Sequence, residues 1–297
     1  MMASMRLDTG AEASRLGHRW LREMPGSVAP RYFARLTESL PLDPALLGDF
    51  APEEDQTASG RVLATVSRWP RGRHMRTTVF SPRALDRAVD ALADWPLSTV
   101  LLLAELDTGD VPINDGELRF EVRADEDDQG PVSVMLSGGD APAGGVMDPD
   151  EAVFSAATDE VRRLCRDMDV DFAIVGDPWT SHAQTSLEEA LGWHGLGLRP
   201  RDVLRGYSWV TVVAREPAAR LGGADAMRAS GAFSSVEELP HGGLWLQATE
   251  RYEEYDRNAV ERVFRAVAPI LPDPRPENFE LGEAPWYLVP ESPVDYR

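Results

Sequence analysis

The chain has 297 residues, of which 43% are hydrophobic and 27% charged, values that are ordinary for a globular protein and exclude a collagen-like or wholly disordered chain. All 30 basic residues are arginine. Schiff-base, P-loop and protein-kinase chemistry therefore lack the lysine that each needs. A net charge of -20 argues against binding to nucleic acid or to an anionic membrane surface, and it suits a basic protein partner.

Three features indicate a cytoplasmic protein. Cys165 is the only cysteine, so no internal disulfide can form and nothing points to an oxidising compartment. The first 20 residues contain no apolar run like the core of a signal peptide. The longest aliphatic stretch, residues 100–104, is far shorter than the roughly 18 residues that a membrane-spanning helix needs.

The first half of the chain predicts a lead-in followed by an α+β unit. Residues 1–60 are expected to be helical and rich in loops, and residues 61–176 to form the first unit. Ser81 and Pro82 are typical of a helix start, and the four arginines around Pro70 and Gly72 predict an exposed basic turn over residues 68–76. The remaining expectations are strands at 61–67, 99–106, 117–123, 132–137 and 170–175, and a helix at 150–166.

The second half predicts a unit of similar plan. Residues 177–205 carry glycine and proline breakers and are expected to be an irregular connection, after which residues 206–297 form the second α+β unit. Strands are expected at 207–214, 233–239, 243–249 and 286–289, and helices at 216–222 and 256–268. The strand beginning at Tyr207 and the strand through Trp245 should share one antiparallel sheet. The sequence thus predicts an α+β fold with two ferredoxin-like (split βαβ) units, each an antiparallel sheet with helices on one face.

Motifs for enzyme chemistry are largely missing. The nearest approach to a nucleophile elbow, residues 206–210, lacks its final glycine and begins a strand. The five histidines form no metal-binding pair, and the glycine-rich segments match no phosphate-binding fingerprint. Cys165 lies on the expected buried side of its helix, where a thiol behaves as a small hydrophobe. We therefore expect a protein that is not an enzyme and holds no metal or organic cofactor.

Two acidic segments are candidate sites for a basic partner protein. Aromatic residues among carboxylates can anchor such a partner, whereas the alternative is that these are solvated loop charges. A metal-dependent enzyme using the acidic loops 107–128 is a second hypothesis, and a scaffold or regulatory protein is a third. The candidate partner-binding residues are Asp125, Glu126, Asp127 and Asp128 in the first segment, and Glu253, Glu254 and Tyr255 in the second.

The most individual part of the chain is residues 205–272. It contains an RGYSW strand, a helix that ends in LGG, a GGLWLQAT strand and a helix that ends near APILP. In this order of elements it resembles immunity-protein families of bacterial polymorphic toxin systems, in particular the immunity protein fifty-two type and its relatives in type VI secretion loci. The matching positions are Gly206, Tyr207, Trp209, Leu221, Gly222, Gly223, Gly243, Trp245 and Pro272.

The resemblance implies an α+β protein that binds and neutralises a toxin and has no catalytic activity. The matching positions have the character of core and turn residues, since the two tryptophans lie in apolar strands and the paired glycines end a helix. The resemblance thus implies a fold and a broad role, but it identifies no binding surface.

Overall fold

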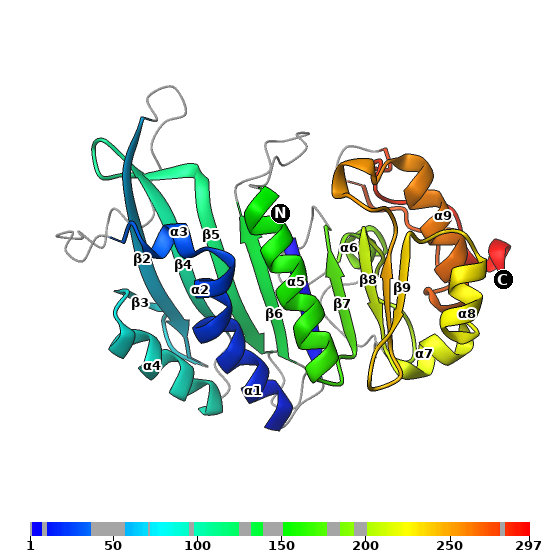
Figure 1. Ribbon diagram of the computed structural model, residues 1–297, viewed down its shortest axis with the longest axis horizontal. Helices are drawn as coiled ribbons and strands as arrows, with labels where there is room; N and C mark the ends of the chain where they lie inside the picture. The colour runs from blue at the N-terminus through cyan, green and yellow to red at the C-terminus, as the bar shows by residue number, and fades with distance from the viewer. Residues whose placement is uncertain are drawn as a thin grey trace. The chain divides into compact units, whose positions relative to one another are not determined.

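The fold is α+β, as expected. The computed structural model describes residues 2–7, 11–36, 57–70, 72–94, 98–124, 132–138, 151–176, 185–192, 201–279 and 283–297 (Figure 1). The chain divides into two compact units, Asp8–Glu160 (unit one) and Met2–Leu7 with Val161–Arg297 (unit two). The long helix α5 (Glu151–Asp167) contributes residues to both.

The sheet of unit one has the strand order β3-β2-β4-β5-β6, and all of these pairings are antiparallel. Its strands are β2 (Ala58–Trp69), β3 (Arg76–Val79), β4 (Ser98–Asp107), β5 (Pro112–Ala124) and β6 (Val132–Gly138). Helix α4 (Pro82–Asp90) and the short helix η4 (Ala91–Asp94) connect β3 to β4 while β2 lies between these strands, which is the expected split βαβ arrangement.

The basic segment before α4 differs from the prediction. We expected residues 68–76 to form a turn, but β2 continues to Trp69 and β3 begins at Arg76, so only the intervening residues connect a hairpin. The Ser81 side chain accepts a hydrogen bond from the Ala84 backbone N–H at 3.1 Å. This contact confirms the predicted start of α4, because such a cap satisfies one of the free donors in the first turn.

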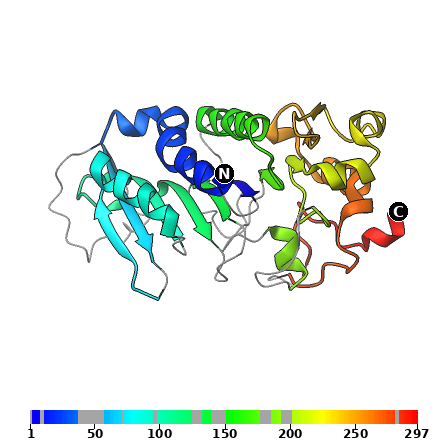
Figure 2. The ribbon, with the colours of Figure 1, turned by 90° about the horizontal axis from the view of Figure 1, so that it is seen from below.

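Helices near the N-terminus pack into unit one. They are α1 (Ala11–His18), the π-helix η1 (Arg19–Glu23), α2 (Met24–Val28) and α3 (Pro30–Phe33). Leu16, Trp20 and Met24 are buried, and the Trp20 indole donates to the Met135 carbonyl oxygen in β6 at 2.9 Å. In Figure 2, α1, α2 and α4 lie on the same side of the strands of unit one. The helices of the expected lead-in are therefore part of the core of this unit.

The sheet of unit two has the order β1-β7-β8-β10-β9, again with antiparallel pairings. Its strands are β1 (Met2–Leu7), β7 (Phe172–Val175), β8 (Val210–Val213), β9 (Ser235–Glu238) and β10 (Leu244–Gln247). Helices α7 (Arg215–Arg220) and α8 (Gly223–Ala229) connect β8 to β9 across β10, which is a second split βαβ arrangement. The predicted pairing is confirmed, since Trp245 in β10 lies opposite Val212 in β8.

Two segments that the sequence predicts as strands differ from the prediction. The strand at 170–175 was expected to close the first unit, but β7 pairs with β8, with Val175 opposite Val210. Residues 286–289 form a turn instead of a last strand. Pro285 and Pro290 flank this segment, and proline cannot donate to a strand ladder. In a ferredoxin-like unit the last strand would pair with the first strand, which here is β8. In this structure β7 pairs with that side of β8.

Helix α9 (Arg257–Val267) buries the apolar side that the sequence predicts, and the short helices η6 (Ala268–Ile270) and η7 (Pro293–Tyr296) follow it. Phe264 contacts Tyr207, with ring centroids 5.9 Å apart, and Tyr296, at 5.4 Å. Gly243 lies where β10 begins, and a Cβ atom there would come within 2.7 Å of the Val213 carbonyl oxygen. Gly243 and Trp245 are two of the positions that match the immunity-protein families. Both are packing positions, as expected.

Candidate partner-binding surface

The two predicted acidic sites have different outcomes. Residues Asp125, Glu126, Asp127 and Asp128 lie outside the described residues. Glu253 and Glu254 are exposed in the short helix η5 (Tyr252–Glu254). Tyr255 is only 4% exposed, so in this structure its side chain offers little surface to a partner. The reason is packing, because its ring lies edge-on to Trp286 with centroids 6.2 Å apart.

Trp209, directly before β8, and Gln247 in β10 hold the turn that carries Glu250. The backbone N–H of Ala248 donates to the Trp209 carbonyl oxygen at 2.8 Å, and the Trp209 indole donates to the Thr249 carbonyl oxygen at 3.1 Å. The Gln247 amide group donates to the Glu250 carbonyl oxygen at 3.1 Å. These contacts fix the backbone of the turn and leave the Glu250 side chain in solvent.

Tyr252 anchors η5 to the sheet of unit two. Its hydroxyl donates to the carbonyl oxygen of Gly176, just after β7, at 3.3 Å, and its ring lies edge-on to Trp209 with centroids 5.9 Å apart. Gly176 has a φ of +91°, and a Cβ atom there would come within 2.7 Å of the Tyr252 ring. A glycine is therefore required for this approach. The carboxylates of Glu253 and Glu254 are presented by a turn that is fixed at its base.

Asp256 links this turn to α9. Its carboxylate accepts a hydrogen bond from the Ala259 backbone N–H at 2.9 Å, as a helix cap does. This hydrogen bond lowers the pKa of the Asp256 carboxyl below its usual value. The group is therefore ionised at neutral pH and adds to the negative charge of the segment.

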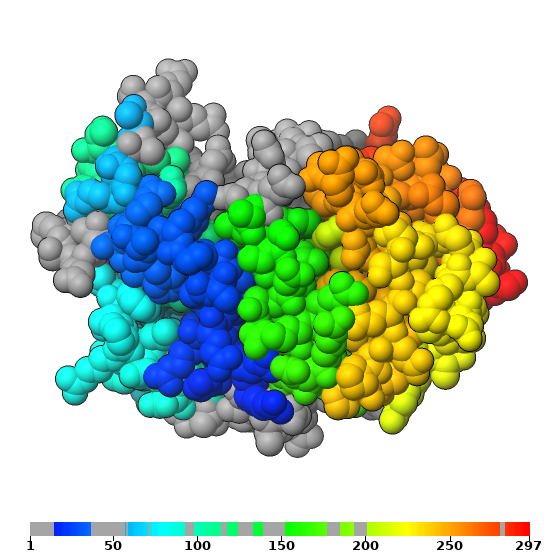
Figure 3. Space-filling view, in the orientation of Figure 1, coloured from blue at the N-terminus to red at the C-terminus, as the bar shows by residue number. Residues whose placement is uncertain are grey.

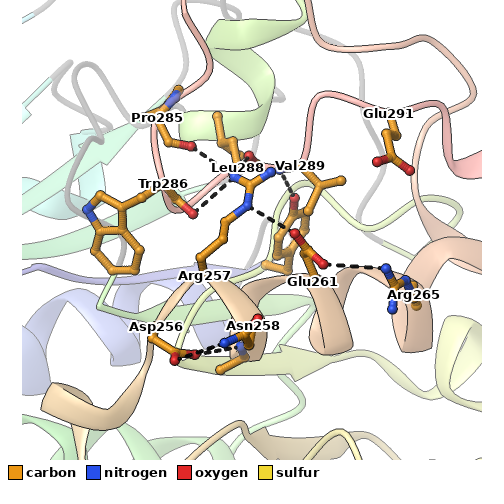
Figure 4. Close-up of polar contacts among 12 residues, drawn as sticks. Asp256, Arg257, Asn258, Glu261, Arg265, Pro285, Trp286, Leu288, Val289 and Glu291 are labelled. Atoms are coloured by element: carbon orange, nitrogen blue, oxygen red, sulfur yellow. Dashed lines mark hydrogen bonds and ion pairs between the residues drawn. The ribbon is translucent and has the colours of Figure 1, made fainter.

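Arg257, the first residue of α9, holds the chain segment that contains Trp286 (Figure 4). Its Nη1 donates to the carbonyl oxygens of Pro285 at 3.3 Å, Trp286 at 3.2 Å and Leu288 at 2.6 Å. Its Nε donates to Glu261, one turn further along α9, at 3.3 Å. One charged side chain thus fixes the backbone from residue 285 to 288 against the start of the helix.

Trp286 is the residue that the sequence-based prediction missed, because its segment was expected to be a strand. Its side chain is 39% exposed, and its ring contacts Tyr255 and, at 5.7 Å, Tyr287. The prolines on both sides were a signal against a strand. The Trp286 ring contacts Tyr255, and Tyr255 directly follows the carboxylates of η5. The exposed Trp286 ring therefore lies near this acidic turn.

We call Glu250, Glu253, Glu254 and Trp286 the acidic aromatic surface. The segment from β10 to α9, amber and orange in Figure 3, forms part of the exterior of unit two. Glu254 is paired with Arg251 at 3.2 Å, whereas Glu250 and Glu253 form no ion pair with any described residue. Two carboxylates of this segment therefore have no ion-pair partner among the described residues, and uncompensated negative charge suits a cationic protein surface.

The described part of segment 107–128 does not assemble a metal site. Asp107 Oδ1 accepts the backbone N–H groups of Gly109 and Val111, each at 2.8 Å. Asp110 is paired with Arg61. Glu121 is buried and accepts hydrogen bonds from Ser98 and Arg119. Among the described residues, no three His, Cys, Asp or Glu side chains come together as metal ligands.

Cys165 is buried in α5, and burial raises the pKa of its thiol well above the ordinary value. A thiol that stays protonated is a poor nucleophile. The expectation that this residue fills space in the core is therefore consistent with its surroundings.

Comparison with known proteins gives one structural likeness. No family model and no curated protein matches the chain. A solved structure described as Pseudomonas aeruginosa T6SS protein PA0821 has a similar fold, with a TM-score of 0.54 and 10% sequence identity, covering 92% of this chain and 73% of that one. At this identity the likeness shows the fold alone. Within the described residues, no helix is both long enough and apolar enough to cross a membrane.

Proposed function

We propose that this protein is a cytoplasmic, non-enzymatic immunity protein of a type VI secretion system, which binds and neutralises a cognate toxin. The observation that carries the proposal is the fold likeness to a protein described as a T6SS protein, over 92% of the chain. The resemblance of residues 205–272 to immunity families supports the same role. A net charge of -20 favours a basic toxin as the partner.

The acidic aromatic surface is the proposed contact region on unit two. Trp286 supplies a large ring that a partner can cover, and tryptophan is among the residues that contribute most to binding at interfaces. Glu250 and Glu253 supply negative charge that steers a basic partner towards this ring. The loop Asp125–Asp128 is a second proposed contact.

The immunity role predicts that a toxin gene lies beside this one, and binding of the product of that gene tests the proposal. The Trp286→Ala variant should raise the dissociation constant at least tenfold, which corresponds to about 1.4 kcal/mol. Trp69→Ala is the matched control, because Trp69 is 46% exposed but belongs to unit one. The control should bind as the wild type does. Equal affinity of all three proteins would refute the acidic aromatic surface as the interface, and the absence of any complex would refute the immunity role.

Charge steering is tested separately through the association rate. Replacing Asp125, Glu126, Asp127 and Asp128 by their amides should slow association at low salt, and the difference should shrink as ionic strength rises because exposed charges are screened. Replacing Glu250 and Glu253 by glutamine should act in the same direction. Asp202→Asn, at an exposed position outside both segments, is the control and should leave the rate unchanged. If either charge-neutralised variant associates as fast as the Asp202→Asn control at low salt, the segment that it changes does not steer the partner.

A further inference from the structure

Strand β3 lies at the end of the strand order of unit one, with β2 as its only neighbour among the described strands (Figure 1). The Phe80 backbone N–H donates to the Ala64 carbonyl oxygen at 2.8 Å, continuing the register in which Thr78 lies opposite Val66. In an antiparallel ladder, residues alternate between bonding to the neighbour and facing away. Phe80 and Thr78 therefore bond to β2, and the backbone groups of Thr77 and Val79 face the open edge.

Three of the large hydrophobic side chains that are exposed in the described residues belong to this hairpin. They are Trp69 at 46%, Met75 at 60% and Val79 at 36% exposure. Val79 lies opposite Thr65, and the same register continued along the hairpin places Met75 opposite Trp69. Residues opposite one another project to the same face, so the three side chains line one face of the hairpin at the open edge.

The hairpin is also basic in an acidic chain. Residues 68–79 contain four arginines and one histidine and no acidic residue. The register places Arg68 directly opposite Arg76, a like-charge pair that destabilises a sheet when nothing neutralises it. Many arginines elsewhere are paired with carboxylates, among them Arg35, Arg162 and Arg201. Arg68, Arg73 and Arg76, in contrast, form no ion pair with any described residue.

We propose that this edge binds an extended acidic segment of a protein partner, which adds to the sheet as a strand beside β3. Thr77 and Val79 each offer one backbone donor and one acceptor to that strand, which provides affinity without regard to side-chain identity. Alternate side chains of the added strand contact Met75 and Val79 on one face, and its carboxylates neutralise Arg76 on the other. The site uses none of the residues of the acidic aromatic surface, so it is independent of the proposed toxin contact.

Two other occupants fit the hairpin less well. A second copy pairing β3 against β3 would bring two arginine-rich hairpins together, and like charges oppose that contact. A nucleic acid or an anionic lipid surface would use the arginines but not the outward-facing N–H and C=O groups of Thr77 and Val79. This backbone edge, which pairs with no other described strand, therefore favours a polypeptide strand.

The test uses a fluorescein-labelled, end-capped peptide of eight alternating glutamate and valine residues, followed by anisotropy with the full chain. Thr77→Pro removes an outward N–H but no ladder bond to β2, because proline is tolerated on the free side of an edge strand. Thr77→Val is the matched control, since it keeps the N–H. An Arg73→Glu, Arg76→Glu variant tests the charge. Thermal unfolding of each variant verifies that the hairpin and its unit remain folded.

The proposal predicts that Thr77→Pro and the charge reversal each weaken peptide binding at least tenfold, while Thr77→Val stays within twofold of the wild type. A glutamine–valine version of the peptide should bind at least tenfold more weakly. Equal binding by the proline and valine variants would overturn the proposal, as would no binding at millimolar peptide. Tighter binding of an oligothymidylate or of anionic vesicles that is insensitive to Thr77→Pro would also overturn it, because that result identifies a purely electrostatic patch. Dimerisation of the chain that Arg76→Glu strengthens would assign the edge to a second copy instead.

Discussion

The guanidinium of Arg205 donates to both carboxylate oxygens of Glu188, with Nε–Oε1 at 2.5 Å and Nη2–Oε2 at 2.6 Å, and both side chains are 7% exposed. Glu188 belongs to α6 (Ser186–Ala190), where it also accepts the backbone N–H of the cap residue Thr185 at 2.9 Å. The Thr185 hydroxyl in turn donates to the Arg205 carbonyl oxygen at 2.7 Å. The buried pair thus fixes α6 to the segment that leads into β8.

Replacing one partner of this pair should be costly. Glu188→Gln leaves the buried Arg205 without its counter-charge, and we expect the free energy of unfolding to fall by about 3–5 kcal/mol. Denaturant unfolding measures this loss. Glu254→Gln is the control, because its pair with Arg251 is exposed and should contribute less than about 1 kcal/mol. Losses of similar size in the two variants would contradict the structural role of the buried pair.

Arg257→Ala should release the segment that presents Trp286. Three carbonyl oxygens lose a charged donor, so we expect faster amide exchange at Val289, whose N–H donates to the Tyr207 hydroxyl at 2.9 Å, and a stability loss of about 1–3 kcal/mol. Arg265→Ala is the control, since Arg265 contacts Glu261 but none of these carbonyl oxygens. Unchanged exchange at Val289 in Arg257→Ala would show that the tether is not needed.

Glu237 should make stability depend on pH in the acidic range. Hydrogen bonds from Arg166 and Arg162 hold the pKa of this carboxyl below its usual value, so the unfolded chain takes up the proton more readily. The stabilisation is present above the unfolded pKa of about 4.3 and is lost as the pH falls through the lower folded pKa. Unfolding measured from pH 6 to pH 3 should show this loss in the wild type and in Glu238→Gln, and a smaller loss in Glu237→Gln. Identical pH profiles for all three proteins would rule out this contribution.

The same substitution at two tryptophans should separate an effect on stability from an effect on binding. Trp245 is fully buried in β10 and lies under the Arg162 guanidinium, 5.4 Å from its ring centroid, so Trp245→Ala should cost about 3–5 kcal/mol. Trp286→Ala removes a part-exposed ring and should cost less than about 1 kcal/mol while weakening toxin binding. Thermal unfolding of both variants measures the difference. A larger loss for Trp286→Ala would place that residue in the core and not at an interface.

Sequence patterns predicted the elements that bury one apolar side. The stripe of Val260, Val263 and Phe264 gave α9, Ser81 and Pro82 gave the start of α4, and the apolar runs gave β8 and β10 as partners. In each case local spacing and tertiary packing agree, so the local pattern was sufficient.

Other features depend on contacts that spacing does not encode. The pairing of β7 with β8, instead of with a strand of the first unit, cannot be predicted from spacing. A short apolar strand carries no information about which sheet it joins. Tyr255 follows a run of carboxylates, a pattern that predicts an exposed residue. It is buried through contacts such as the one with Trp286, which lies 31 residues further along the chain. Trp286 itself is displayed because Arg257 binds the surrounding carbonyl oxygens, which only the folded chain brings together.

Protection of living cells tests the central claim most directly. The toxin that the immunity role predicts beside this gene is expressed in bacterial cytoplasm together with the wild-type protein, with Trp286→Ala or with the Trp69→Ala control, at matched protein levels. The immunity role predicts that the wild type and the control restore growth and that Trp286→Ala restores it less. Continued killing in the presence of folded wild-type protein would contradict the proposed function.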